Sequence, residues 1–362
     1  MKAQNQTEAK RKNKNNILKL ILTGHPISRI ELARETGLTK MTVTNLVGEL
    51  IHEGIVAETG VTDTAAGRKP VQLGIVPGAR QVLGIYISRD FISTFLGDFC
   101  GSVTLEERVP LKDETNETFL EKLFSQTERI FRAETTKNLC AVGISCIGPL
   151  DRKKGVILNP PNFYGIQNLE ISKLLKNRYA LPVFIDNDMN TSALAEQYFG
   201  RAKHKKHFIY LGVARGIGAG VVANGRLQAG ERGYSAEIGH VTVDIHGIPC
   251  SCGNTGCLEL YASFPAEWEN MNAERQQEKL KEMCYYLSAG CVTLINLFDP
   301  QTIYLGHEIA KCADRAVPLL QKYIGDRYLG SQYKQITVEA SAFQDNSPVY
   351  GAVALCAEQL LE

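Results

Sequence analysis

The sequence lacks an apolar run long enough to cross a bilayer, and its first residues are not apolar. A membrane-spanning helix needs about 20 consecutive apolar residues, so an integral membrane protein is excluded. The first residues, Met1 to Gln6, are polar and lead into a basic stretch instead of the apolar core of a secretion signal. We therefore expect the protein to stay in the cytoplasm.

The composition also lacks the signs of a disordered or a disulfide-stabilised chain. The 362 residues are 44% hydrophobic and 22% charged, which is typical of a soluble globular protein. The length predicts two or three packed units. Ten cysteines stand in a large chain without a secretion signal, so reduced thiols or a metal site are favoured over disulfides.

The net charge is only +1, but it is unevenly distributed. Residues 1–70 contain eleven Lys or Arg and seven Asp or Glu. This segment therefore carries +4, and residues 71–362 carry −3. A mildly basic N-terminal piece precedes a mildly acidic body.

The first seventy residues have the pattern of a helix-turn-helix domain. Apolar residues between 17 and 22 predict a helix that ends at Gly24. Ser28 and Glu31 have capping-box spacing for a second helix, and Gly37 supplies a left-handed turn. A third helix is expected to begin near Thr39. Its expected inward positions are Met41, Val43, Leu46, Val47 and Leu50.

The third helix and the segment after it carry groups suited to nucleic acid. Hydrogen-bonding residues at the start of the helix fit base edges and phosphates, namely Thr39, Lys40, Thr42, Thr44 and Asn45. Residues 54–58 and 71–73 predict a two-stranded wing. Arg68 and Lys69 in its loop suit an A·T-rich minor groove. A small helical bundle with a solvated polar face and a solvated basic turn are the alternatives.

Residues beyond 82 predict an α/β body. Strands are expected at 82–87, 92–96, 103–109, 140–146 and 182–185, with helices at 116–134 and 191–199. A similar order restarts with strands at 207–213 and 216–222, a helical stretch at 266–298 and a strand from 302. Two α/β lobes would enclose a cleft for a small ligand. The expected domains are residues 1–75, 76–195 and 196–362, and the last helix is free to return to the first lobe.

One histidine and three cysteines form the sharpest chemical pattern in the sequence. The spacing is His-x9-Cys-x-Cys-x4-Cys, with two glycines in the final loop that allow a tight turn. One imidazole and three thiolates suit a closed, tetrahedral structural Zn²⁺ site. Free core cysteines are the alternative. The expected ligands are His240, Cys250, Cys252 and Cys257.

Carboxylates gather around this pattern and at the end of a strand. Glu237 precedes His240 by three residues, and Glu259 follows Cys257 by two. Residues 186–190 contain two Asp and two Asn at the C-terminal end of the expected strand 183–185. Such a position suits hydroxyl recognition or general-base chemistry. A helix N-cap is the alternative for Asp188 or Asn190.

These segments resemble the ROK family of sugar kinases and related repressors. The resemblance is carried by residues 237–240 and 250–259, and residues 160–162, 187–190 and 216–220 agree with it. It covers almost the whole chain. With the N-terminal helix-turn-helix, the chain is similar to the repressor branch and to its xylose-repressor type. The resemblance implies a two-lobed, ribonuclease-H-like body of the actin and hexokinase type, with a sugar in the cleft.

The resemblance also implies which residues bind the sugar and where this sequence departs from the phosphate-binding loops of the kinases. Asp188 matches the base that deprotonates the sugar in the kinases, and His240 would use one ring nitrogen for zinc and the other for a sugar hydroxyl. The implied sugar ligands are Asn162, Asn187, Asp188, Glu237, His240 and Glu259. The glycines of the kinases' first phosphate loop are missing from residues 84–91, Ala214 and Arg215 precede Gly216, and His307 follows Gly306. Kinase activity is therefore not expected.

We expect a homodimeric, or dimer-of-dimers, repressor of carbohydrate-utilisation genes. Each helix-turn-helix would read half of an inverted repeat in operator DNA, and sugar in the cleft would release the DNA. One alternative is an ATP-dependent sugar kinase with an appended DNA-binding head. Another is a repressor that is controlled by a protein partner instead of a soluble sugar.

Overall fold

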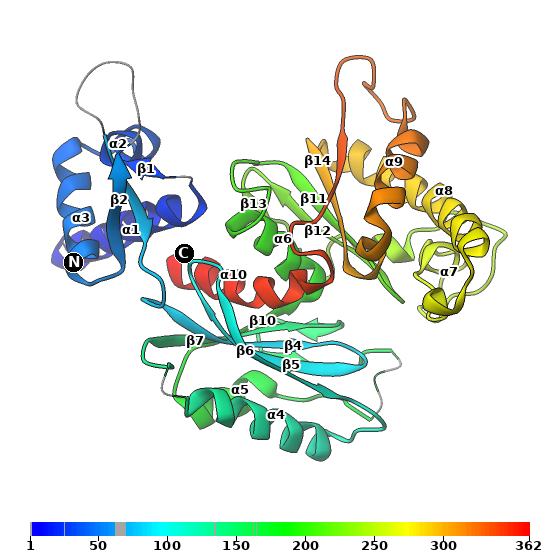
Figure 1. Cartoon of the computed structure of the whole chain (residues 1–362), viewed down its shortest axis with the longest axis horizontal. Coiled ribbons are helices and arrows are strands. Elements are labelled where there is room, and N and C mark those ends of the chain that lie inside the picture. The colour runs from blue at the N-terminus through cyan, green and yellow to red at the C-terminus, as the bar shows by residue number, and fades with distance from the viewer. Residues whose placement is uncertain (1, 25, 62–69, 134, 162, 164) are drawn as a thin grey trace. The chain divides into compact units, whose positions relative to one another are not determined.

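The computed structural model describes residues 2–24, 26–61, 70–133, 135–161, 163 and 165–362, which Figure 1 colours along the chain. The chain divides into two compact units. The first contains residues 1–186 and 352–362, and the second contains residues 187–351. Among the described residues, no helix is long and apolar enough to cross a membrane.

The N-terminal part of the first unit has three helices and a small antiparallel sheet in the order β1-β3-β2. Ser28 and Glu31 form the predicted capping box, and Gly37 takes a left-handed φ of 68°. The predicted helix-turn-helix and wing strands are present, with the two-residue strand β1 added. The elements are α1 (Lys2–Thr23), β1 (Ile27–Ser28), α2 (Arg29–Thr36), α3 (Lys40–His52), β2 (Val56–Val61) and β3 (Val71–Ile75).

One expected inward position of α3 is wrong. Met41 is 70% exposed, whereas Val43, Leu46, Val47 and Leu50 are buried. Two residues along a helix correspond to a rotation of about 200°, so Met41 points away from the side on which Val43 is buried.

The body of the first unit is a five-stranded sheet in the order β10-β7-β4-β5-β6. Helices α4 and α5 cover one face, and the C-terminal part of α10 covers the other (Figure 1). A Cβ at Gly143 would lie 2.1 Å from Ala352 O, so this glycine admits α10 to the sheet. The elements are β4 (Gln81–Ile87), β5 (Phe91–Asp98), β6 (Val103–Pro110), α4 (Asn116–Phe131), β7 (Leu139–Cys146), β8 (Leu150–Asp151), β9 (Val156–Ile157), α5 (Ile171–Tyr179), β10 (Val183–Asn187) and α10 (Ser347–Leu361).

The second unit has a five-stranded sheet in the order β13-β12-β11-β14-β15. Ile209 and Leu211 of β11 pack with α8 and α9, whereas Phe208 and Tyr210 face Ala193 of α6. The elements are α6 (Asp188–Tyr198), β11 (Phe208–Val213), β12 (Ile217–Ala223), β13 (Arg226–Leu227), η1 (Ile238–His240), α7 (Glu259–Ala262), η2 (Trp268–Asn270), α8 (Ala273–Phe298), β14 (Thr302–Gly306), η3 (His307–Cys312), α9 (Ala313–Ile324), β15 (Thr337–Ala340) and η4 (Gln344–Asn346).

The division between the units falls earlier than the expected boundary at residue 195. Helix α6 belongs to the second unit because it packs closely on β12, where a Cβ at Gly220 would lie 2.3 Å from Met189 O. Residues 352–362 are grouped with the first unit. A separate domain at residues 1–75 stays a prediction. The expected helical stretch 266–298 is interrupted, because Asn272 caps α8 after the short helix η2.

Candidate metal centre and sugar site

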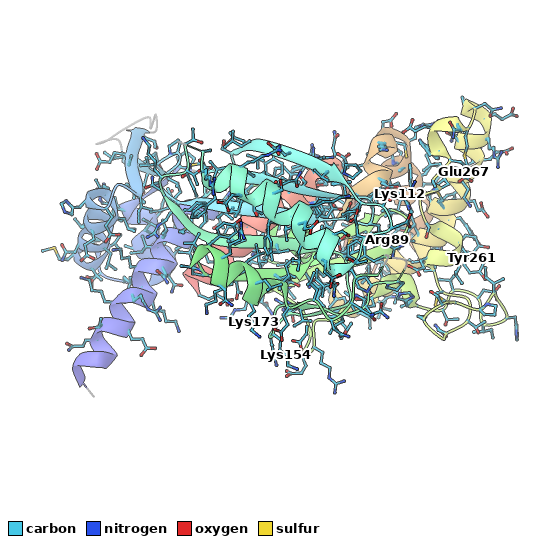
Figure 2. The ribbon with its side chains drawn as sticks, turned by 90° about the horizontal axis from the view of Figure 1, so that it is seen from below. Arg89, Lys112, Lys154, Lys173, Tyr261 and Glu267 are labelled. Carbon is cyan, nitrogen blue, oxygen red and sulfur yellow. The ribbon has the colours of Figure 1, made fainter. Side chains whose placement is uncertain are left out.

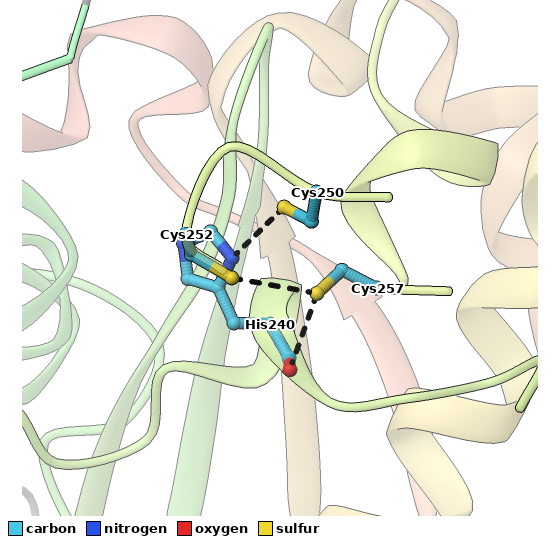
Figure 3. A group of neighbouring side chains, drawn as sticks. All are labelled: His240, Cys250, Cys252 and Cys257. Atoms are coloured by element: carbon cyan, nitrogen blue, oxygen red, sulfur yellow. Dashed lines mark hydrogen bonds between the residues drawn. The ribbon is translucent and has the colours of Figure 1, made fainter. Parts of the chain in front are cut away.

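The predicted metal ligands come together in the second unit. The ligand atoms of His240, Cys250, Cys252 and Cys257 all lie within 4.8 Å of one another (Figure 3). The Sγ atoms of Cys252 and Cys257 are 3.7 Å apart, and His240 Nδ1 is 3.8 Å from Cys250 Sγ. Tetrahedral zinc with Zn–S bonds of about 2.3 Å places two sulfurs about 3.8 Å apart. These residues therefore fit a tetrahedral metal ion.

The loop that carries the cysteines depends on local backbone geometry. Gly253 and Gly256 have φ angles of 92° and 66°, which L side chains rarely adopt. A Cβ at Gly256 would also lie 1.7 Å from Asp244 O. Asn254 Nδ2 donates to His240 O at 3.1 Å and so ties the loop to the histidine. The neighbouring Tyr261 of α7, labelled in Figure 2, stacks on Tyr286 of α8 with ring centroids 4.8 Å apart.

The thiols differ in their electrostatic environment. Burial, followed by the neighbouring Cys250 and Cys252, raises the pKa of Cys257 to about 12. A backbone hydrogen bond from Asn254 is the largest effect at Cys252 and holds its pKa below the ordinary value. A divalent cation would have to displace protons from such a set, because thiolates are the ligands.

Glu237 lies within electrostatic range of His240, Asp188 and Glu259. Burial raises the pKa of Glu237, and the charges of Asp188 and Glu259 raise it further, whereas His240 lowers it. Glu259 Oε1 lies 3.7 Å from His240 Nδ1. The second unit thus places three of the predicted sugar ligands, Asp188, His240 and Glu259, within electrostatic range of a fourth, Glu237.

Two local features bring these side chains together. Gly239 lets η1 approach β12, because a Cβ there would lie 2.3 Å from Ile217 O and 3.4 Å from Glu259 Oε2. Asn187 is the N-cap of α6, and its Oδ1 accepts from Met189 N at 2.9 Å. The cap is therefore Asn187 and not Asp188 or Asn190. Asn162 lies outside the described residues.

Asp186, at the end of β10, pairs with Arg152 within the first unit. Its side chain is fully buried, and Oδ2 lies 2.5 Å from the guanidinium of Arg152. The ion pair with arginine accounts for this buried carboxylate, so Asp186 needs no role in ligand binding to explain its position.

Two residues of the candidate DNA-binding face, Thr39 and Thr42, form the N-terminal cap of α3. Thr39 is the N-cap of α3, since its side chain accepts from Thr42 N, and its Oγ1 lies 2.9 Å from Thr42 Oγ1. Thr44 Oγ1 donates to Lys40 O at 2.8 Å. Lys40, Thr44 and Asn45 are exposed. Arg68 and Lys69 lie outside the described residues.

Residues 82–359 match the ROK family. The chain belongs to the ROK family. A xylose repressor of Caldicellulosiruptor bescii is 31% identical over 99% of this chain and 98% of its own length. The solved ROK family transcriptional regulator that is a homologue of E. coli MLC protein is 26% identical with a TM-score of 0.80, over 98% of this chain and 97% of its own. The ROK hexokinase from Thermus thermophilus is 28% identical with a TM-score of 0.64, over 77% of this chain and 99% of its own.

These matches fix the architecture of the chain. It has the mixed α/β body of ROK regulators and ROK kinases, which is the two-lobed, actin-like fold that the sequence predicts. The regulator matches a much larger share of this chain than the hexokinase does. The chain thus agrees with ROK regulators over nearly its full length.

The turn between β4 and β5 is closed by its own serine. Ser88 Oγ accepts from Asp90 N at 3.2 Å and from Phe91 N at 3.1 Å, and it donates to Phe91 O. The backbone N–H groups of Asp90 and Phe91 are therefore already hydrogen-bonded. The resemblance predicts that this segment lacks the phosphate-loop glycines of the kinases.

Sequence reasoning missed two buried residues near Asp188. His307 lies 5% exposed at the start of η3, and Tyr210 of β11 is fully buried. Tyr210 Oη is 2.9 Å from His307 Nδ1. In the sequence, His307 is notable only as the residue after Gly306, because its proximity to Tyr210 depends on the pairing of β11 with β14.

Proposed function

We propose that this ROK protein is a transcriptional repressor that binds operator DNA and releases it when a sugar binds. One observation carries the proposal: a chain with an N-terminal helix-turn-helix also holds carboxylates and an imidazole close together in its second unit. Its relative in Caldicellulosiruptor bescii is a xylose repressor. Xylose is therefore the first effector to test.

The proposed sugar site uses carboxylates as hydrogen-bond acceptors. Asp188, Glu237 and Glu259 would accept from sugar hydroxyls, because ionised carboxylates accept strong hydrogen bonds. His240 Nδ1 faces Cys250 and Glu259, which leaves the other ring nitrogen for a hydroxyl. Asn162 and Asn187 complete the proposed set.

We assign zinc to the site formed by His240 and the three cysteines. All four positions of a tetrahedral ion are then filled by protein, so the ion would be structural. A bound ion would supply rigidity, since it fixes the orientation of His240 and of the loop that leads to Glu259.

The geometry of the turn between β4 and β5 disfavours phosphoryl transfer. Backbone N–H groups that cradle phosphates must be free to donate, but Ser88 Oγ accepts from those of Asp90 and Phe91. His307 follows Gly306 where the resemblance implies a second glycine in the kinases. We therefore propose a kinase-like body without kinase activity.

We assign operator recognition to the exposed start of α3. Lys40 suits phosphates, and Thr44 and Asn45 suit base edges, while the wing residues Arg68 and Lys69 would enter the minor groove. Thr39 and Thr42 hold the helix start in place. A homodimer would present two such helices to an inverted repeat.

The test is fluorescence anisotropy on DNA upstream of the protein's own gene, at fixed salt because phosphate contacts make affinity fall steeply with salt. Xylose and then other pentoses and hexoses are added to the complex. Loss of binding with one sugar supports the proposal. DNA binding that ignores every sugar favours a protein partner as the controlling ligand.

A coupled assay for ADP release with the same sugars tests the kinase alternative. The proposal predicts no sugar-dependent ADP release. Steady turnover with one sugar would instead identify an ATP-dependent sugar kinase with a DNA-binding head.

A further inference from the structure

His307 joins the proposed sugar site to a buried tyrosine. Its Nδ1 is 2.9 Å from Tyr210 Oη, and its Nε2 is 3.6 Å from Asp188 Oδ2. A distance of 3.6 Å is just too long for a hydrogen bond. Within the described part of the chain, buried Nε2 has no hydrogen-bond partner. The imidazole is therefore fixed at one nitrogen and unsatisfied at the one that faces Asp188.

The surrounding backbone is shaped to hold this imidazole. A Cβ at Gly212 would lie 2.8 Å from His307 Nδ1, and a Cβ at Gly306 would lie 2.1 Å from Tyr210 Oη. His307 itself has a φ of 65°, which is uncommon for a residue other than glycine. Such a conformation persists only where neighbouring structure holds it.

Tyr210 links His307 to the start of α10. Burial raises the pKa of Tyr210 far above its ordinary range, so the phenol stays protonated, although the Ser347 hydroxyl acts on it in the opposite direction. Ser347 is the first residue of α10, and its Oγ lies 2.8 Å from Ser341 Oγ. A series of neighbouring polar side chains thus lies within the second unit, in the order Asp188, His307, Tyr210 and Ser347.

The C-terminal end of α10 contacts α1. Glu358 of α10 accepts from Lys19 of α1 at 2.6 Å within the first unit. Helix α1 is in turn tied to α3 through Lys10 and Glu49, 2.7 Å apart. A displacement of α10 therefore has a direct route to the helix that is proposed to read DNA.

We propose that His307 is a positioning residue of the sugar site and that it passes the state of Asp188 to α10. The inference rests on the proposed function, because it assumes that a sugar hydroxyl binds Asp188. Movement of this carboxylate by a few tenths of an ångström would make a hydrogen bond to His307 Nε2. Since Tyr210 holds the other ring nitrogen, the imidazole carries the displacement toward Ser347.

The test separates sugar affinity from the response of the DNA-binding head. Tyr210→Phe removes the hydroxyl that contacts His307 Nδ1. The matched control is Tyr304→Phe, because Tyr304 is the partner of Tyr210 on β14 and is equally buried. Its hydroxyl donates to Arg201 O at 3.2 Å, away from His307. Both variants lose the same atom from neighbouring core positions.

Calorimetry measures the Kd of the sugar found in the operator assay, and anisotropy measures the operator Kd with and without saturating sugar. We expect Tyr210→Phe to bind sugar within about threefold of the wild type, while the sugar-induced rise in operator Kd falls about tenfold. Tyr304→Phe should keep both values. A merely structural role of Tyr210 would not separate affinity from response.

A second variant, His307→Gly, suits the left-handed backbone and removes the imidazole. We expect weaker sugar binding and little operator release. The inference is overturned if Tyr210→Phe releases operator as the wild type does, or if Tyr304→Phe loses the response to the same extent. If the wild type neither binds sugar nor responds to it, the proposed function itself fails, and the inference fails with it.

Discussion

Lys19 and Glu358 form an ion pair, with Nζ and Oε2 2.6 Å apart, between the helix that begins the chain and the helix that ends it. The carboxylate side chain is only 9% exposed, and the ammonium side chain is 28% exposed. Asn15 of α1 adds a longer hydrogen bond to Leu360 O at 3.4 Å. Helix α10 is therefore bonded directly to α1 within the first unit.

Glu358→Gln should lower the stability of the full chain by about 1–3 kcal/mol, because it leaves Lys19 without its charged partner in a mostly buried position. Thermal unfolding followed by circular dichroism measures the change. The control is Glu282→Gln in the exposed pair Lys279–Glu282, 2.9 Å apart. That variant should cost less than about 0.5 kcal/mol. Equal losses in the two variants would show that the buried pair contributes nothing special.

The zinc assignment predicts one Zn²⁺ ion per chain by elemental analysis of the purified protein. Cys252→Ser should lose most of the metal and lower the melting temperature, because a hydroxyl is a poor replacement for a thiolate ligand. Cys100→Ser is the control, since Cys100 is an exposed cysteine outside the cluster. A metal-free wild type that melts at the same temperature as Cys252→Ser would contradict a structural ion.

Zinc binding should also depend on pH. Burial raises the pKa of Cys257 to about 12 without a metal, so zinc must displace a proton from this thiol. Protons then compete with the metal, and the apparent zinc affinity should fall as the pH falls. Competition with a zinc-binding dye measures the apparent zinc affinity at several pH values between about pH 8 and about pH 6. An affinity that does not change with pH would argue against thiolate ligands.

Two exposed residues of α3 should affect DNA binding in different ways. Lys40→Ala should reduce the salt dependence of binding by about one counterion, because a phosphate contact is lost on any sequence. Asn45→Ala should cost about 1–3 kcal/mol on the operator and relax its specificity. The control is Lys173→Ala on α5, whose exposed lysine is labelled in Figure 2. Identical salt slopes and specificities for all three variants would refute the assignment to α3.

Local patterns in the sequence were sufficient for much of this account. The capping box at Ser28 and Glu31 and the left-handed Gly37 depend on residues a few positions apart, and the structure has both. The four metal-ligating residues fall between residues 240 and 257 and converge as predicted. Such features can be predicted from the sequence, because residues close together in the chain have few conformations available to separate them.

Features that depend on distant parts of the chain could not be read in the same way. Tyr210 and His307 are 97 residues apart and meet only because β11 and β14 pair in parallel. Lys19 and Glu358 are farther apart still, and the strand β1 is too short to show alternation. Met41 shows the opposite error, since an apolar residue was assigned to the core although its angular position on α3 faces outward.

The most direct test of the account compares operator release by the effector sugar in the wild type and in Asp188→Asn. The amide keeps the size of the side chain but is a weaker acceptor for a sugar hydroxyl. Glu267→Gln, a change at an exposed carboxylate labelled in Figure 2, is the control. The account predicts that Asp188→Asn binds operator as the wild type does without sugar and needs at least about tenfold more sugar for release. Release at the wild-type sugar concentration would contradict the assignment of the sugar to Asp188.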